Sequence, residues 1–363
     1  MASRFLALIL LFWGSFSATV NGKCPCEDQS LCEPIARPPG KEFLMFSTKP
    51  NVWRKYDWTK VTTIALFRPW DDELMCEAHK RGVRVVLAAN FPTEKLSSKE
   101  VRTKWIHNLT QEALARHADG VNIDIESPIA KRSREVTLLT KLVNETATAF
   151  RSAIKNSQVS FDIAWSPDCI DGRCYDAEAL SKVVDFLVVM AYDEQSQIKT
   201  GNCVAKANSP LKQTKAAIGE YLALGIRPEK LVLGLPWYGY DYPCLELNEN
   251  ICSIKRVPFR GVNCSDAAGR QVEYADIQDL ILSRDAKAQW DEDSASFFFN
   301  YEDTVGGKHQ VWFDNVQSLK QKYEFASAEN LNGVAIWNSD LLDYSDILRA
   351  QQETKAMWDA LQH

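Results

Sequence analysis

The chain has 363 residues, of which 45% are hydrophobic and 25% are charged, a composition that excludes disordered and collagen-like proteins. The net charge of -6 supplies no positive field for a phosphate backbone, so we expect no nucleic-acid partner. Past the N-terminus no stretch is apolar over the roughly 20 residues that a bilayer span requires, so we expect no membrane span.

The first residues have the pattern of a secretory leader. Arg4 precedes an apolar run from Leu6 to Phe16, which is followed by small residues. We expect cleavage near Gly22, so that residues 1–22 are a signal peptide and residues 23–363 form the mature protein. A leader also gives weight to three glycan acceptor triplets, at Asn108, Asn144 and Asn263.

All ten cysteines lie in the predicted mature chain, and an even number of cysteines in a secreted protein predicts disulfides. Two pairs, Cys169 with Cys174 and Cys244 with Cys252, are close enough in sequence to close small loops. The count alone leaves the pairing open. A zinc site is disfavoured because none of the five histidines lies near the N-terminal cysteine cluster, so we expect no metal.

After a Cys- and Pro-rich opening, short apolar runs alternate with longer amphipathic stretches, which is the pattern of repeated βα units. The eight runs expected to be strands are Phe43–Phe46, Thr62–Phe67, Val83–Ala89, Gly120–Ile125, Val159–Trp165, Phe186–Tyr192, Leu231–Pro236 and Gly333–Trp337. The stretches expected to be helices are Asp72–Lys80, Lys99–Ala115, Arg134–Ile154, Glu178–Val183, Lys212–Leu224, Val316–Ala326 and Ile347–Leu361. Eight buried parallel strands predict a closed (βα)8 barrel, the TIM barrel of the α/β class.

The gap between the seventh and the eighth predicted strand is much longer than the other gaps. It is rich in aromatic residues and cysteine, and a loop of that length without secondary structure is improbable. We therefore expect an inserted α+β subdomain, at about residues 238–312, that forms a wall on one side of the barrel mouth.

The segment Asp119–Glu126 lies on the fourth predicted strand and alternates polar and apolar residues. A strand with this period places Asn122, Asp124 and Glu126 on one face, and in a barrel that face points inward. Glu126 then stands at the C-terminal end of the strand, where barrel enzymes keep their active sites. A lone D-x-E would more often be a pair of solvated carboxylates, so the wider pattern has to decide between the two interpretations.

The segment Asp119–Glu126 resembles the D-G-x-D-x-D-x-E signature of family 18 glycoside hydrolases, the chitinase family. Three further elements are similar to that family and follow in its chain order. Val189–Asp193 resembles M-x-Y-D on the sixth strand, Leu235–Gly239 resembles P-x-Y-G on the seventh, and Gly333–Trp337 resembles G-x-x-x-W on the last. Together these motifs extend over most of residues 40–340.

The resemblance implies a role for each matched residue. Glu126 would donate the proton to the glycosidic oxygen, Asp124 would hold the 2-acetamido N–H of the substrate, and Tyr192 would bind the acetamido oxygen. The family uses the acetamido group of the sugar as nucleophile, so neither a metal nor an organic cofactor is implied. The residues expected to bind substrate are Asp193, Trp337, Tyr238 and Trp165.

Finer features, the Cys-Pro-Cys opening and the Trp-Tyr-Gly-Tyr-Asp-Tyr run among them, resemble a lysosomal branch of the family that degrades glycoproteins. This resemblance implies hydrolysis of the β-1,4 bond in N,N'-diacetylchitobiose cores and in short GlcNAc oligomers, with retention of configuration. We expect a lysosomal monomer with a GlcNAc-containing oligosaccharide as its substrate. The alternative is a non-catalytic, lectin-like family member that binds GlcNAc, but such members typically lack the acid that Glu126 supplies here.

Asn122 departs from the family pattern, which has an aspartate at this position. Without a third carboxylate we expect Asp124 and Glu126 to lose their shared proton at lower pH, which would confine activity to the acid side. On this interpretation, the substitution Asn122→Asp should shift the alkaline limb of the kcat/KM profile upward.

Overall fold

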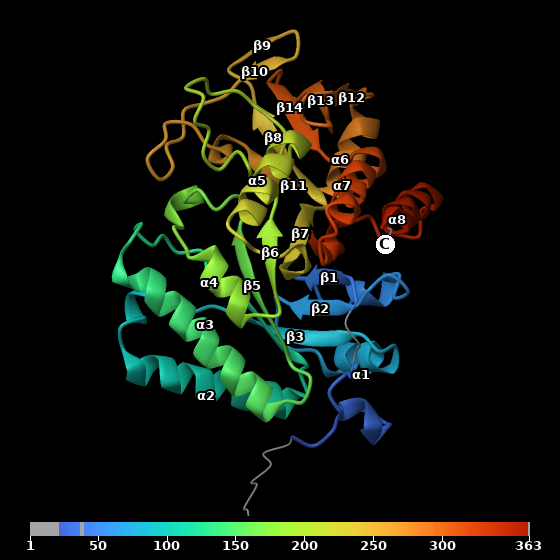
Figure 1. Ribbon diagram of the computed structural model, residues 1–363. Helices are drawn as coiled ribbons and strands as arrows, with labels where there is room; N and C mark the ends of the chain where they lie inside the picture. The colour runs from blue at the N-terminus through green and yellow to red at the C-terminus, as the bar shows by residue number, and fades with distance from the viewer. Residues whose placement is uncertain (1–21, 37–39, 362–363) are drawn as a thin grey trace, which may run out of the picture.

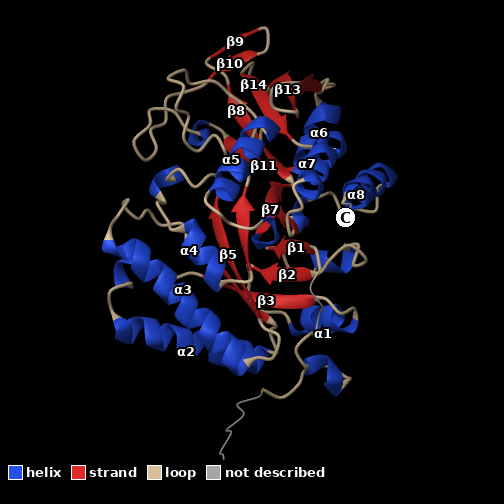
Figure 2. Ribbon diagram, in the orientation of Figure 1, coloured by secondary structure: helices blue, strands red, loops and turns tan. Residues whose placement is uncertain are grey.

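The computed structural model describes residues 22–36 and 40–361, so the predicted leader lies outside the described residues except for Gly22. Eight parallel strands close into a barrel in the order β1-β15-β7-β6-β5-β4-β3-β2, which confirms the predicted fold (Figures 1 and 2). The barrel strands are β1 (Glu42–Ser47), β2 (Thr63–Leu66), β3 (Arg84–Ala89), β4 (Gly120–Asp124), β5 (Gln158–Ala164), β6 (Phe186–Met190), β7 (Leu231–Pro236) and β15 (Gly333–Trp337).

The seven predicted helices are all present, each within two residues of its predicted ends. They are α1 (Asp72–Lys80), α2 (Lys99–Arg116), α3 (Arg134–Ala153), α4 (Ala177–Val183), α5 (Leu211–Ala223), α7 (Val316–Ala328) and α8 (Leu348–Ala360). An eighth helix, α6 (Tyr274–Ser283), lies in the long gap after β7 and was not predicted. Where a helix follows β1 in a regular barrel, this chain has only a short 3-10 turn, Val52–Lys55.

The barrel strands separate two sets of buried side chains. Leu44, Val86 and Val188 belong to a small apolar cluster inside the barrel. Their sequence neighbours Met45 and Val85 belong to the large cluster between the barrel and its helices. This alternation is the period-two pattern of a strand that is buried on both faces. Apolar side chains therefore fill the interior of the barrel, and any polar group there needs hydrogen-bond partners.

The long segment between β7 and β15 forms a second, antiparallel sheet, which Figure 1 shows beyond the tips of the barrel arrows. Its order is β11-β8-β14-β13-β12, with α6 packed against it and the hairpin β9-β10 beside it. These strands are β8 (Tyr238–Pro243), β9 (Glu246–Asn248), β10 (Ile251–Ser253), β11 (Arg270–Glu273), β12 (Gln289–Asp291), β13 (Ser296–Glu302) and β14 (Lys308–Phe313). The sheet stands at the C-terminal end of the barrel, where the catalytic motif ends.

All ten cysteines are paired. The two small loops suggested by spacing are closed by Cys169–Cys174 and Cys244–Cys252, and the remaining disulfides are Cys24–Cys32, Cys26–Cys76 and Cys203–Cys264. Within the described residues, the one group of side chains spaced like a metal site consists of Cys24, Cys26 and Cys32, whose sulfurs are all in disulfides. No helix in the described ranges is both long and apolar enough to cross a bilayer.

Candidate active site

Strand β4 carries the predicted motif and lies close against β5 at its start. A Cβ on Gly120 would come within 1.9 Å of the carbonyl oxygen of Gln158, so only glycine allows this approach. From there the apolar residues of the motif, Val121 and Ile123, pack fully buried toward the helices. Asn122 is fully buried inside the barrel. The predicted division of the strand into an apolar outer face and a polar inner face is therefore correct.

The third carboxylate that the motif lacks is supplied by the neighbouring strand. Asp162 on β5 is paired in register with Asp124, and its Oδ1 accepts a hydrogen bond of 2.8 Å from the side-chain amide of Asn122. The same amide nitrogen donates to Ser160 Oγ at 3.0 Å. The expectation that no third carboxylate lies beside Asp124 is therefore wrong. The motif on β4 alone does not show this carboxylate, because it depends on the register with β5, which pairs Asp162 with Asp124 on the same side of the sheet.

Burial controls the protonation of these two carboxyls. Burial raises the pKa of Asp124 to about 7, and the negative charge of Glu126 adds to this effect while the Arg173 guanidinium opposes it. Burial likewise raises the pKa of Asp162 well above its usual value, with the charge of Asp124 as the next cause. Because two carboxylates cannot both ionise in so apolar a place, the pair retains a proton into the weakly acidic range.

Glu126 stands just past the end of β4, with 55% of its side chain exposed. Its Oε2 accepts a hydrogen bond of 2.5 Å from Nη1 of Arg173, a residue of the loop after β5. Sequence reasoning did not identify Arg173. Nothing in its local pattern could have done so, because the contact joins residues 47 positions apart.

A cavity of about 220 Å³ opens beside Glu126 at the C-terminal end of the barrel. It is lined by residues from the ends of β4, β5 and β6 and from the inserted segment, and these include Glu126, Trp165, Arg173, Tyr192, Asp193, Tyr240 and Asp266. The structure therefore brings together four of the predicted site residues. Two side chains of this region also have an unpaired polar atom. Asp124 Oδ1 and Trp165 Nε1 are buried without a hydrogen-bond partner among the described residues.

Asp193 is held by the inserted sheet. Its Oδ1 accepts hydrogen bonds from the hydroxyls of Tyr238 at 2.6 Å and Tyr240 at 3.0 Å, both on β8. Burial raises the pKa of Asp193, and these two hydrogen bonds oppose the rise. Tyr238 was expected to line the pocket, but it is itself buried behind Asp193. Tyr240 reaches the cavity instead, so Tyr238 is placed to orient Asp193.

Trp337, at the end of β15, lies beside Tyr192, with their ring planes 21° apart and centroids 6.5 Å apart. Phe46 and Phe67 pack edge-on against it from β1 and the end of β2. The indole is thus fixed in place while remaining partly exposed, as a platform for a sugar face requires.

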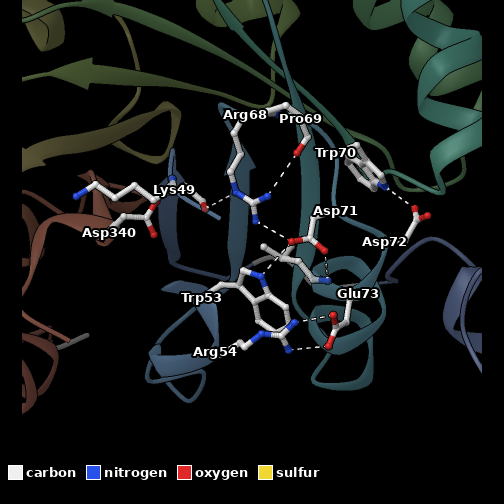
Figure 3. A network of polar contacts seen from close by, with 12 residues as sticks. Lys49, Trp53, Arg54, Arg68, Pro69, Trp70, Asp71, Asp72, Glu73 and Asp340 are labelled. Atoms are coloured by element: carbon white, nitrogen blue, oxygen red, sulfur yellow. Dashed lines mark hydrogen bonds and ion pairs between the residues drawn. The ribbon is translucent and has the colours of Figure 1, made fainter. Parts of the chain in front are cut away.

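The loops on that side of the mouth are tied down by polar contacts (Figure 3). Arg68 donates to Ser47 Oγ at 3.4 Å and to Asp71 Oδ2 at 3.0 Å, which joins the ends of β1 and β2. Asp71 also accepts from the Trp53 indole at 3.1 Å and caps the N-terminus of α1. Asp340, just past β15, accepts from the backbone of residues 48 and 49. This network keeps the β1, β2 and β15 ends at fixed positions around the Trp337 ring.

Residues 77–341 of the chain match the family model described as Glycosyl hydrolases family 18. The chain belongs to this family. A rat protein named di-N-acetylchitobiase is 46% identical over 339 residues, which cover 93% of this chain and 92% of the relative. Its human namesake is 45% identical, over 93% of this chain and 88% of that protein.

Solved structures named as chitinases share the fold. The C-terminal domain of a chitinase from Desulfitobacterium hafniense superposes with a TM-score of 0.71 over 89% of this chain and 98% of that one, at 20% identity. A family 18 chitinase from Cycas revoluta, solved in complex with (GlcNAc)3, gives a TM-score of 0.70 over 88% of this chain and 99% of its own, also at 20% identity. At this level of identity the likeness shows the fold alone.

Proposed function

We propose that this chain hydrolyses the β-1,4 bond of N,N'-diacetylchitobiose cores and short GlcNAc oligomers, by retaining catalysis in which the acetamido group of the substrate is the nucleophile. The observation that carries the proposal is a solvent-reachable carboxyl, Glu126, at the mouth of a small cavity. Buried carboxyls that retain a proton lie directly behind it. Two relatives that align over nearly the full chain are named for this reaction.

Glu126 would protonate the glycosidic oxygen as the bond to the leaving sugar breaks. The acetamido oxygen would attack the anomeric carbon, so that no enzyme carboxylate becomes covalently linked. After the leaving sugar departs, the Glu126 carboxylate would take a proton from the incoming water. A single group therefore serves first as acid and then as base.

The acetamido group would be held between Asp124 and Tyr192. Asp124 presents a buried oxygen that has no partner among the described residues, which suits an N–H donor. Burial raises the pKa of the Tyr192 hydroxyl well above its usual value, so it stays a hydrogen-bond donor throughout the working pH range. The remaining contacts would come from Asp193, from the Trp165 indole and from the face of Trp337.

Several broader features belong to the same proposal. Residues 23–363 would form one catalytic domain with the insertion at about 238–312, act as a monomer, and reach the lysosome through the secretory pathway. The three glycan acceptors, Asn108, Asn144 and Asn263, are all exposed, as glycosylation requires. The small cavity favours short oligosaccharides over polymeric chitin.

The deciding experiment is the substitution Glu126→Gln, assayed on N,N'-diacetylchitobiose. The amide fills the same space but has no proton to donate, so we expect kcat to fall at least ~10²-fold while inhibition by GlcNAc oligomers persists. Glu178→Gln, on the exposed face of α4, is the matched control and should retain full activity. Turnover near the wild-type rate by folded Glu126→Gln protein would refute the mechanism. Oligomer binding without turnover by the wild-type protein would favour the lectin-like alternative.

A further inference from the structure

We propose that Arg173, on the disulfide-closed loop 169–174, is a positioning residue that holds the carboxylate of Glu126 in place and, through its charge beside Asp124, limits the pH range of activity. This inference rests on the proposed function, because it assigns Arg173 a role in the same reaction. It concerns a residue that lies outside the four sequence motifs.

The geometry shows a guanidinium fixed between two carboxylates. Arg173 Nη1 donates to Glu126 at 2.5 Å and Nη2 donates to Asp171 at 3.0 Å, and only 7% of the Arg173 side chain is exposed. An arginine held by a second carboxylate cannot swing away freely, and its charge is weakly screened when it is buried. Arg173 therefore acts on Glu126 as a fixed cation.

Asp171 is itself firmly held. Its Oδ1 accepts from Ser196 Oγ at 2.9 Å and its backbone N–H donates to Gln197 Oε1 at 2.8 Å. Arg260, from the inserted segment, donates to its carbonyl oxygen at 2.5 Å. The insertion thus contributes to the position of Arg173 without reaching Glu126.

The loop is also bound to the segment that follows Glu126. The backbone N–H of Ile129 donates to the carbonyl of Gly172 at 2.9 Å, and Cys174 N–H donates back to Ile129 at 3.2 Å. The Tyr175 hydroxyl donates to the carbonyls of Ile125 at 2.9 Å and Ser127 at 2.6 Å, on either side of Glu126. The disulfide Cys169–Cys174 closes this loop at its base. The loop therefore fixes both the backbone and the side chain of Glu126.

The charges around Glu126 oppose one another. Arg173 brings a positive charge to its carboxylate, whereas the other carboxyls nearby are acidic. The titratable groups that face it are Arg173 and Tyr175 after β5, Asp171 in the same loop, Asp124 on β4, Asp162 on β5, and Tyr192 and Asp193 after β6. Arg173 also counteracts the rise in the pKa of Asp124. Its removal should therefore let Asp124 hold its proton to higher pH.

This arrangement suits the second half of the reaction. Once Glu126 has given up its proton it must remain a carboxylate, correctly placed, until water arrives. A fixed cation holds that carboxylate in place, and the same cation opposes the retention of a proton on Asp124. The grip of Arg173 is thus expected to confine activity to the acid side even though Asp162 supplies the carboxylate missing at position 122.

The test compares pH profiles of kcat/KM on N,N'-diacetylchitobiose for Arg173→Gln, Arg173→Lys and Arg270→Gln. Arg270 is an exposed arginine paired with Asp241, so its removal changes the net charge equally at a residue that does not line the cavity. We expect the alkaline limb of Arg173→Gln to move up by about 0.5 to 1 pH unit, with Arg173→Lys restoring most of the wild-type profile. The Arg270→Gln profile should match the wild type. Coincident profiles for all four proteins would overturn the proposal.

A second measurement needs no Arg173 variant and no activity. In arginine-labelled wild-type protein at pH 6, the Arg173 guanidinium should be among those that rotate slowly because they bond two acceptors, and its rotation should become faster in Glu126→Gln protein. Identical arginine spectra for the two proteins would also overturn the proposal. Absence of turnover by the wild-type protein would instead count against the proposed function, and the spectra would still test the contact.

Discussion

Glu194 is a buried acid whose titration should be visible in the stability of the whole protein. It directly follows Asp193, only 2% of it is exposed, and burial raises its pKa to about 8. One oxygen accepts from Thr214 Oγ1 at 2.9 Å, and the other has no partner among the described residues. The unfolded chain releases this proton near the usual value of 4.5, whereas the folded chain retains it. Between these two values the folded state binds more protons, so stability must fall as the pH rises.

The substitution Glu194→Gln removes this dependence while keeping the size of the side chain and the acceptor for Thr214. Between pH 4.5 and 8, each pH unit lowers the contribution of Glu194 to the free energy of unfolding by about 1.4 kcal/mol. At pH 7 this contribution is therefore about 3 kcal/mol less favourable than at pH 4. Urea unfolding of both proteins at several pH values measures the difference in the free energy of unfolding. That difference should grow in favour of Glu194→Gln from pH 5 to pH 7, whereas the exposed control Glu229→Gln should show no such trend. A difference that stays constant with pH would refute the burial argument.

Two further predictions concern the reaction. The substitution Asp162→Asn keeps an acceptor for the Asn122 amide but removes a carboxyl beside Asp124. The alkaline limb of the kcat/KM profile should therefore move to lower pH by about half a unit or more. An unmoved limb would show that Asp162 does not share the proton. Cellobiose should not be cleaved, because it carries a hydroxyl in place of the acetamido nucleophile. If product analysis showed turnover comparable to that of N,N'-diacetylchitobiose, an enzyme carboxylate would have to be the attacking group.

The barrel could be predicted from the sequence because its evidence is local. Each strand is a short, largely apolar run, and helices such as α1 are amphipathic with recognisable ends, as at Asp71, whose side chain caps α1. Helix α6 was missed because it lies among the short strands of the insertion, where no regular alternation of elements guides the prediction. The disulfide pairing could not be predicted either, except for the two loops closed by cysteines five and eight positions apart.

From spacing alone, without the resemblance to a family, the site was predictable only along a single strand. Asn122, Asp124 and Glu126 follow a single period-two pattern, so their common face could be derived from spacing. Arg173 depends on a loop conformation, with left-handed φ values of 52° at Cys169 and 53° at Asp171, that no propensity would suggest. Such contacts become visible only when the elements are assembled.

Asp162 could be predicted from the sequence in part, and its presence changes how Asn122 is interpreted. Ser160 and Asp162 alternate with apolar residues on β5 just as Asn122 and Asp124 do on β4, so their inward direction was available from the sequence. The register between the strands was not, and the register is what puts Asp162 level with Asp124. The apolar interior of the barrel tolerates few charges. Asp162 on β5, hydrogen-bonded to the Asn122 amide on β4, can therefore share one proton with Asp124, much as two carboxylates on β4 would. The pH dependence of this enzyme should therefore respond to substitution of Asp162 and of Arg173, and the asparagine in the motif is no evidence that the proton is missing.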